Sequence, residues 1–134
     1  MTFQAERPIY TQLMDKIKGQ IAAGRLTPGE KIDSIRDLAA FYAVNPNTVQ
    51  RALSELERDG LLSTRRASGK MVTEDEQVIK ELRSRLASER IEALLSAMES
   101  LGFSAGETRE LFDRAQKARH CQADTAEITQ GGGS

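Results

Sequence analysis

Apolar residues at helical spacing mark the first element of the chain. They run from Ile9 to Ile21 and predict an amphipathic helix with one buried face (Ile9, Tyr10, Leu13, Met14, Ile17 and Ile21). Pro8 stands just ahead of this stretch, where a helix tolerates proline, and Gly24 follows where the helix is expected to end. The Pro-Gly pair at 28–29 then predicts a tight turn.

Two further helices are predicted, each with its own N-terminal cap. Ser34 can cap a short helix, and Asp37 stands where the acid of a capping box belongs. Asn45 can cap a third helix with Pro46 at its first position, and this helix is expected to stop at Gly60. Its apolar residues fall on one face (Val49, Ala52, Leu53 and Leu56).

After the third helix the pattern changes from helix to strand. Residues 61–64 and 71–73 have the composition of short strands, and the segment between them is polar and basic. This order predicts a β-hairpin whose tip carries Arg65, Arg66 and Lys70.

The rest of the chain is predicted to be helical. Apolar residues run through 74–101, but the stripe that ends at Leu86 is offset by one position from the stripe that follows. The offset indicates either a bend or a change of packing partner. Ser104 and Glu107 form a capping box for a last helix. Residues 120–134 are polar and end in Gly-Gly-Gly-Ser, so we expect a flexible tail there.

Composition limits the class of protein. No apolar run is long enough for a transmembrane helix, and 29% of residues are charged, so we expect a cytoplasmic protein without a membrane partner. The single Cys121 fits a reducing compartment. It has only His120 beside it, and a zinc site needs about four ligands, so we predict no metal or cofactor. Residues 1–72 carry eleven Lys and Arg against eight Asp and Glu, which suits a polyanionic partner.

The order of these elements is that of a winged helix-turn-helix. We therefore predict a mainly α fold with a small β-wing. Residues 8–73 are expected to form the winged helix-turn-helix, 74–119 a two-helix dimerisation tail, and 120–134 the flexible tail.

The third predicted helix has surface chemistry suited to the major groove of DNA. Its buried stripe leaves four side chains without negative charge to face outward near the N-terminus (Asn47, Thr48, Gln50 and Arg51). The backbone N–H groups of Asn47 and Thr48 are expected to be free to bind an anion. Arg51 could instead pair with Glu55. On the hairpin, the basic residues suit phosphate or minor-groove contacts.

The sequence also resembles a known family. The segments PIYTQLMDKIKGQIAAGRLTPGEKI, SIRDLA and VNPNTVQRALSELERDGLLSTRR are similar to the DNA-binding domain of the GntR family. The segment SERIEALLSAMESLGFSAGET is similar to the short two-helix tail of its YtrA subgroup. The resemblance covers about residues 8–115 and implies a transcriptional regulator, as a rule a repressor, that binds double-stranded DNA as a homodimer on a palindromic operator. It also implies a nearby transporter operon as the target, and DNA contacts by Arg36, by Pro46 through Arg51, and by residues 65–70.

Two positions depart from the family pattern. Asp33 stands where a proline usually precedes the Ser-x-Arg of the second helix, and it places an acid near the expected phosphates. Ala67 and Ser68 leave Gly69 as the single glycine of a tip that usually has two, so only Gly69 is suited to a positive φ there.

The two C-terminal helices cannot bury both of their apolar faces in one short hairpin. A symmetric second copy would cover them, with contacts spread over both helices (Leu82, Leu86, Ile91, Leu94, Met98, Leu101, Leu111 and Phe112). Such a seam encloses little space beside the roughly 300 Å³ of a small-molecule site. An unknown small-molecule effector could bind there, although no residue identifies one.

Two other classes of function fit the sequence less well. A winged helix can serve as a protein–protein module without DNA, but the uncharged-to-basic outer edge of the third helix argues against this class. For an enzyme we find no Ser/His/acid set, no phosphate-binding glycine loop and no metal spacing, and we reject that class.

Overall fold

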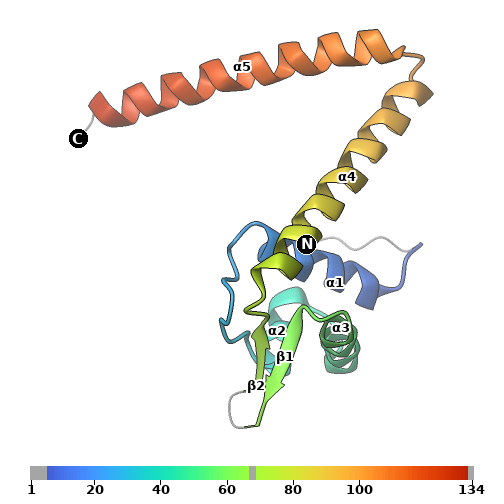
Figure 1. Cartoon of the computed structure of the whole chain (residues 1–134), viewed down its shortest axis with the longest axis vertical. Coiled ribbons are helices and arrows are strands. Elements are labelled where there is room, and N and C mark those ends of the chain that lie inside the picture. Colours follow the sequence, from blue (N-terminus) through green and yellow to red (C-terminus); the bar gives the residue numbers. More distant parts are fainter. Residues whose placement is uncertain (1–5, 67–68, 133–134) are drawn as a thin grey trace. The chain divides into compact units, whose positions relative to one another are not determined.

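The computed structural model describes residues 6–66 and 69–132, and its elements follow the predicted order (Figure 1). The helices and strands are α1 (Ile9–Ala22), α2 (Ile35–Tyr42), α3 (Pro46–Arg58), β1 (Leu62–Arg65), β2 (Gly69–Val72), α4 (Glu76–Ser100) and α5 (Ala105–Gly132). The prediction of a mainly α fold with a small β-wing is confirmed. The chain divides into two units, Met1–Ala87 and Ser88–Ser134, which are described separately below.

Local capping signals set where α2 and α3 begin. The Ser34 side chain accepts a hydrogen bond from the Asp37 N–H at 3.1 Å, as the predicted cap requires. The Asn45 side chain accepts from the Asn47 N–H at 2.7 Å, and Pro46 occupies the first helical position of α3. Both helices therefore start at the residues that the sequence pattern indicated.

The segment before α2 pairs with the wing, which the sequence did not predict. The expected tight turn is present, because the Glu30 N–H donates to the Thr27 carbonyl at 3.0 Å and Gly29 has a φ of +79°. Beyond the turn, the Ile32 N–H donates to the Lys70 carbonyl at 3.0 Å, and the Val72 N–H donates to the Glu30 carbonyl at 2.9 Å. Residues 30–32 thus run along the free edge of β2 and join it to the start of α2.

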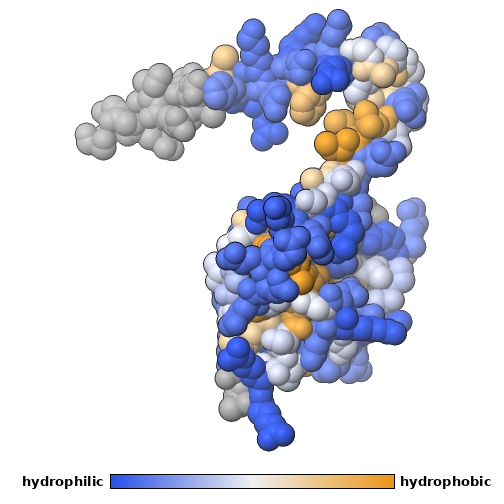
Figure 2. Space-filling model, in the orientation of Figure 1, coloured by the Kyte–Doolittle hydropathy of each residue, from blue (hydrophilic) through white to orange (hydrophobic). Residues whose placement is uncertain are grey.

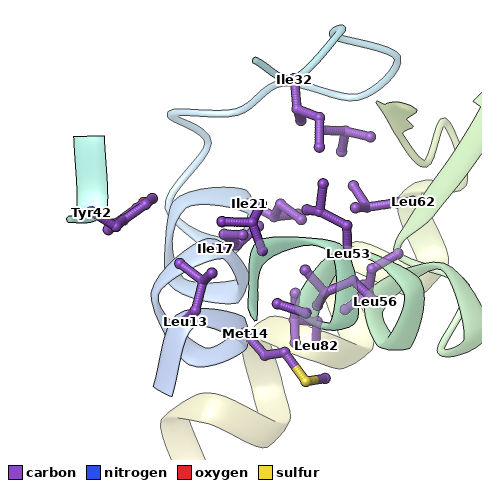
Figure 3. Packing of buried hydrophobic residues seen from close by; sticks show 14 of the residues in the cluster. Leu13, Met14, Ile17, Ile21, Ile32, Tyr42, Leu53, Leu56, Leu62 and Leu82 are labelled. Carbon is purple, nitrogen blue, oxygen red and sulfur yellow. The ribbon is translucent and has the colours of Figure 1, made fainter. Parts of the chain in front are cut away.

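One apolar cluster holds the first unit together (Figure 3). Its members include residues from the buried faces of α1 and α3, from the wing and from the loop at Ile32 (Leu13, Met14, Ile17, Ile21, Ile32, Val49, Ala52, Leu53, Leu56, Leu61, Leu62 and Val72). Each fully buried Leu or Ile stabilises such a cluster by about 1.5–3 kcal/mol. Because α3 buries one face here, its opposite face must point outward.

The beginning of α4 belongs to this cluster as well, which corrects the sequence prediction. Ile79 and Leu82 are 7% and 1% exposed, and Leu86 is partly buried against the cluster. The Arg83 Nε donates to the Ala22 carbonyl at 3.0 Å. The first unit therefore extends to Ala87, past the predicted limit at residue 73. A dimer contact at Leu82 is contradicted, because its side chain is already buried within one chain (Figure 3).

The second unit contains the remainder of α4 and all of α5. The α4 helix is continuous through Ala87, and the offset between its two apolar stripes falls where the first unit ends. The predicted capping box is present, since the Ser104 N–H donates to Glu107 Oε1 at 3.0 Å and the Glu107 N–H donates to Ser104 Oγ at 3.2 Å.

The C-terminal segment also differs from its prediction. The α5 helix continues to Gly132, so the segment expected to be a flexible tail from 120 is helical up to that residue, and 133–134 lie outside the described residues. None of the described helices has the length and apolar character needed to cross a membrane.

Candidate nucleic-acid interface

The outward face of α3 is polar and carries no acid. Its exposed side chains share one side of the helix, at spacings of three, four, seven and eleven residues (Asn47, Gln50, Arg51, Ser54 and Arg58). Pro46 is exposed at the start of the helix, and Thr48 is half-buried. Ser54 and Arg58 were missed by the sequence reasoning, although the same helical spacing would have placed them on this face.

The backbone at the start of α3 is not free to bind an anion, contrary to the prediction. The Asn47 N–H donates to the Asn45 side chain, and the Thr48 N–H donates to the Asn45 carbonyl at 2.9 Å. The cap that starts the helix therefore uses the same two donors. Any contact with a nucleic acid at this end must come from side chains.

Arg51 has an aromatic partner, and the alternative pairing with Glu55 is not formed. Its guanidinium carbon lies 3.9 Å from the centre of the Tyr10 ring, in a cation–π arrangement. Glu55, which could have paired with Arg51, lies 3.7 Å from the Arg58 guanidinium. Arg51 is therefore supported from α1 while its charge is not neutralised by Glu55.

Arg36 is exposed in the first turn of α2, the first helix of the helix-turn-helix. Asp33 is exposed three residues earlier, yet no ion pair joins either Asp33 or Asp37 to Arg36 among the described residues. The effect of Asp33 falls on Tyr42 instead: burial raises the pKa of the Tyr42 hydroxyl, and the negative charge of Asp33 raises it further. Arg36 therefore has no acidic partner among the described residues.

The wing is a two-stranded antiparallel hairpin in which Thr64 lies opposite Lys70 and Leu62 opposite Val72. Because side chains alternate along a strand, Thr64 and Lys70 lie on the same face of the hairpin as buried Leu62 and Val72. That face points to α3. Lys70 Nζ accordingly makes a short ion pair with Glu57 of α3, and Thr64 Oγ1 donates to the same carboxylate at 2.9 Å.

This ion pair corrects the predicted role of Lys70. Its side chain is only 18% exposed and its charge is matched by Glu57, so it is not an outward-facing DNA ligand. The hydrogen bonds from Lys70 and from Thr64 lower the pKa of the Glu57 carboxyl, so the carboxylate stays ionised further into acid than an ordinary glutamate. We refer to Glu57, Thr64 and Lys70 as the wing latch, because they join the wing to α3.

The other basic residues of the wing remain exposed. Arg65 lies 3.6 Å from Glu74, but both side chains are more than half exposed, and such a pair contributes about 1 kcal/mol or less. Arg66 is exposed in the turn after β1. Ala67 and Ser68 lie outside the described residues, and Gly69 has a positive φ of +80°. The predicted basic tip is therefore made by Arg65 and Arg66.

A cavity of about 690 Å³ separates the wing from the N-terminus of α2. Its lining includes Ser34 and Asp37 of the α2 start and Gly69 and Lys70 of the wing. Lys31, on the segment that pairs with β2, also lines it and is exposed. Sequence reasoning missed Lys31, because its position beside the wing depends on a long-range pairing. It adds a further cation beside the wing.

Comparisons with known proteins agree with this geometry. Residues 9–72 match the family model described as bacterial regulatory proteins, gntR family. The chain is 39% identical over 108 residues to the helix-turn-helix transcriptional regulator YhcF of Bacillus subtilis, with 81% of this chain and 89% of YhcF covered. It is also 39% identical over 72 residues to the transcriptional repressor YtrA of the same organism, covering 54% of this chain and 55% of YtrA.

Solved structures give the same result. A GntR family transcriptional regulator from Listeria monocytogenes has a TM-score of 0.76 and 35% identity, covering 84% of this chain and 98% of that one. The DNA-binding domain of AraR, solved in complex with operator ORX1, has a TM-score of 0.51 and 27% identity, covering 54% of this chain and 93% of that one.

These matches cover both the winged helix-turn-helix and most of the chain, and the proteins concerned are transcription regulators rather than enzymes. This chain is accordingly a transcriptional regulator with a DNA-binding winged helix. It belongs to the GntR family of bacterial regulatory proteins, and its similarity to YtrA supports a place in the YtrA subgroup.

Proposed function

We propose that this protein represses transcription in the cytoplasm by binding a palindromic operator on the chromosome as a homodimer. The observation that carries the proposal is the outward face of α3, on which every exposed side chain from Asn47 to Arg58 is polar or basic and none is acidic. A helix with such a face fits the major groove, where side-chain donors and acceptors read base edges. Repression is supported by the names of relatives such as YtrA.

The residues of the interface divide into two roles. Asn47 and Gln50 present amide groups on the first turns of α3, and amides pair with adenine edges in the major groove. The exposed cations around them suit phosphates, which fix the position of the protein on the duplex without reading sequence (Lys31, Arg36, Arg65 and Arg66). Arg51 has donors for either contact.

The second unit leaves an apolar surface uncovered. Figure 2 shows apolar surface along the second half of α4. Ile91, Leu101 and Phe112 are 57%, 71% and 50% exposed, and Leu94 and Leu95 are also exposed. Met98 and Leu111 are half-buried within this unit. Exposed apolar patches of this kind mark interaction surfaces, because burial of such side chains is the main favourable term in association.

A second copy of the chain is the partner that we propose for this surface. A twofold axis would place the same apolar residues of both copies against each other (Ile91, Leu94, Leu95, Met98, Leu101, Leu111 and Phe112). Leu82 is excluded because it is buried in the first unit, and Leu86 packs at the edge of that unit. The dimer would carry two copies of α3, and each could enter one half of a palindromic site.

Selection of DNA from a random pool tests this function. The purified protein would be mixed with duplexes that contain a randomised segment, and bound duplexes would be amplified and sequenced over several rounds. We expect an inverted repeat whose half-sites are centred about 10 base pairs apart, or a multiple of that spacing. If no sequence were enriched above the starting pool, the proposal of sequence-specific binding would be overturned. Mapping the selected motif onto the genome would then show whether a transporter operon is a target.

A further inference from the structure

The contact between Tyr10 and Arg51 joins α1 to the outward face of α3. The guanidinium carbon of Arg51 lies 3.9 Å from the centre of the Tyr10 ring, well within the range of a cation–π contact. Both residues belong to the first unit, but they come from helices that are separate in sequence. Tyr10 of α1 thus supports Arg51, an α3 residue that we place at the DNA interface.

Tyr10 is a fixed support for this contact. Its ring is half-buried and packs against the apolar cluster of the first unit. The chain leading into α1 is held by Gln12, whose Nε2 donates to the Arg7 carbonyl at 2.8 Å, and by the ion pair between Arg7 and Asp15 at 2.6 Å. The start of α1 is therefore held by a hydrogen bond to the backbone and by an ion pair between side chains. The Tyr10 ring consequently has little freedom to move with Arg51.

The stack leaves the hydrogen-bonding groups of Arg51 available. A guanidinium that lies over an aromatic ring uses the face of its plane, whereas its N–H donors point outward within the plane. Glu55, the acid that could have occupied those donors, is paired with Arg58. A flexible arginine loses rotamer freedom when it binds a ligand, and a side chain already held in place loses less.

We propose that Tyr10 is a positioning residue for DNA binding: its ring holds the Arg51 guanidinium in place before the DNA arrives. The inference rests on the proposed function, and it adds a residue of α1 to an interface otherwise made by α2, α3 and the wing. Tyr10 acts through Arg51, so the loss of the ring should matter only while Arg51 is present.

Binding measurements on four variants test this role, with the duplex selected by the wild-type protein as probe. Tyr10→Leu keeps apolar volume against the cluster but has no ring face, and we expect its affinity to fall about two- to fivefold. Tyr10→Phe keeps the ring, so its affinity should equal that of the wild type. Tyr10→Leu should have no further effect in an Arg51→Ala background. Thermal unfolding of each variant checks that the fold is retained.

An NMR measurement without DNA separates this inference from the proposed function. The ring current of Tyr10 should shift the Arg51 side-chain protons upfield in the wild type and in Tyr10→Phe, and Tyr10→Leu should lose that shift. The inference is overturned if Tyr10→Leu binds the selected duplex as tightly as the wild type, or if it weakens binding equally in the Arg51→Ala background. If the ring-current shift is present but the wild type selects no DNA, the proposed function fails and the positioning role fails with it, although the stack stands.

Discussion

Ala43 adopts a backbone conformation that normally requires glycine. Among the described residues it alone has a positive φ without being glycine, with φ 56° and ψ 48° at the C-terminus of α2. The conformation is retained because the N–H groups of Ala43 and Val44 both donate to the last carbonyls of α2, which ends the helix and turns the chain toward α3. The turn of the helix-turn-helix is thus formed at some cost in backbone strain.

Replacement of Ala43 should relieve that strain. The left-handed conformation costs an alanine about 1–2 kcal/mol, and glycine loses about 0.5–1 kcal/mol of that gain to its greater freedom in the unfolded chain. We expect Ala43→Gly to raise the free energy of unfolding by about 0.5–1 kcal/mol, measured by chemical denaturation. Ala40→Gly, on the exposed side of the same helix, is the matched control and should destabilise by about 1 kcal/mol. A loss of stability in both variants would contradict this account of the turn.

Residues that act through their immediate neighbours were predictable from the sequence. The caps at Ser34, Asn45 and Ser104 depend on groups two or three residues away, and the structure has each of them. Ala43 and the stack of Arg51 on Tyr10 were not predicted. The first departs from the usual residue preference, and the second depends on how two helices pack.

At the scale of elements, the wing combines residues with different roles. Arg66 is exposed near its tip, whereas Lys70 is held in the wing latch by Glu57 and Thr64. The alternation of side chains would have indicated this difference from sequence, since Lys70 lies two residues before the buried Val72 and so shares its face. The pairing of residues 30–32 with β2 could not be inferred in this way, because it joins segments about 40 residues apart.

The two cations of the wing should differ in their effect on DNA binding. Arg66→Ala removes a phosphate contact from each half of a dimer, so the slope of log affinity against log salt should become shallower by about 2. Lys70→Met should leave that slope unchanged, because the Lys70 charge is matched by Glu57. Titrations of the selected duplex at several salt concentrations give both slopes. An equal loss of slope in the two variants would mean that Lys70 also contacts phosphate.

The wing latch should depend on pH through Glu57. Its folded pKa lies below the ordinary value of 4.5, so its contribution to stability is complete above pH 4.5 and is lost as the pH falls through the folded pKa. Glu57→Gln should therefore destabilise by about 0.5 kcal/mol at pH 7, as for an exposed ion pair screened by solvent, and the difference should disappear in acid. Denaturation curves from pH 7 down to acid measure it. A difference that persisted unchanged in acid would show that charge plays no part in the latch.

At the scale of the whole molecule, the boundary between the two units determines where the chain can be truncated while the first unit still folds. Ile79 and Leu82 of α4 are buried in the apolar cluster of the first unit, so this unit needs residues beyond the wing. The spacing of these apolar residues was visible in the sequence, but periodicity identifies a buried face and not the surface that covers it. This is why the sequence alone assigned Leu82 to a dimer contact.

Two truncations test the division. Residues 1–87 should fold and remain monomeric, since they keep the cluster and lack the exposed apolar residues of the second unit. Residues 1–73 should be less stable by about 3–6 kcal/mol, because two buried side chains are lost. Thermal unfolding followed by circular dichroism compares their stability, and sedimentation gives their mass. If 1–73 were as stable as 1–87, the start of α4 would not belong to the first unit.

In the proposed complex, each copy of α3 in a symmetric dimer reads the base sequence of one half-site. The most direct test repeats the DNA selection with Gln50→Ala and compares the enriched motif with that of the wild type. We predict that the variant selects the same inverted repeat but loses preference at one base pair in each half-site, where discrimination falls by about 1–3 kcal/mol. An unchanged motif would contradict base reading by this face of α3. A change in one half-site alone, or a motif without symmetry, would contradict the dimer.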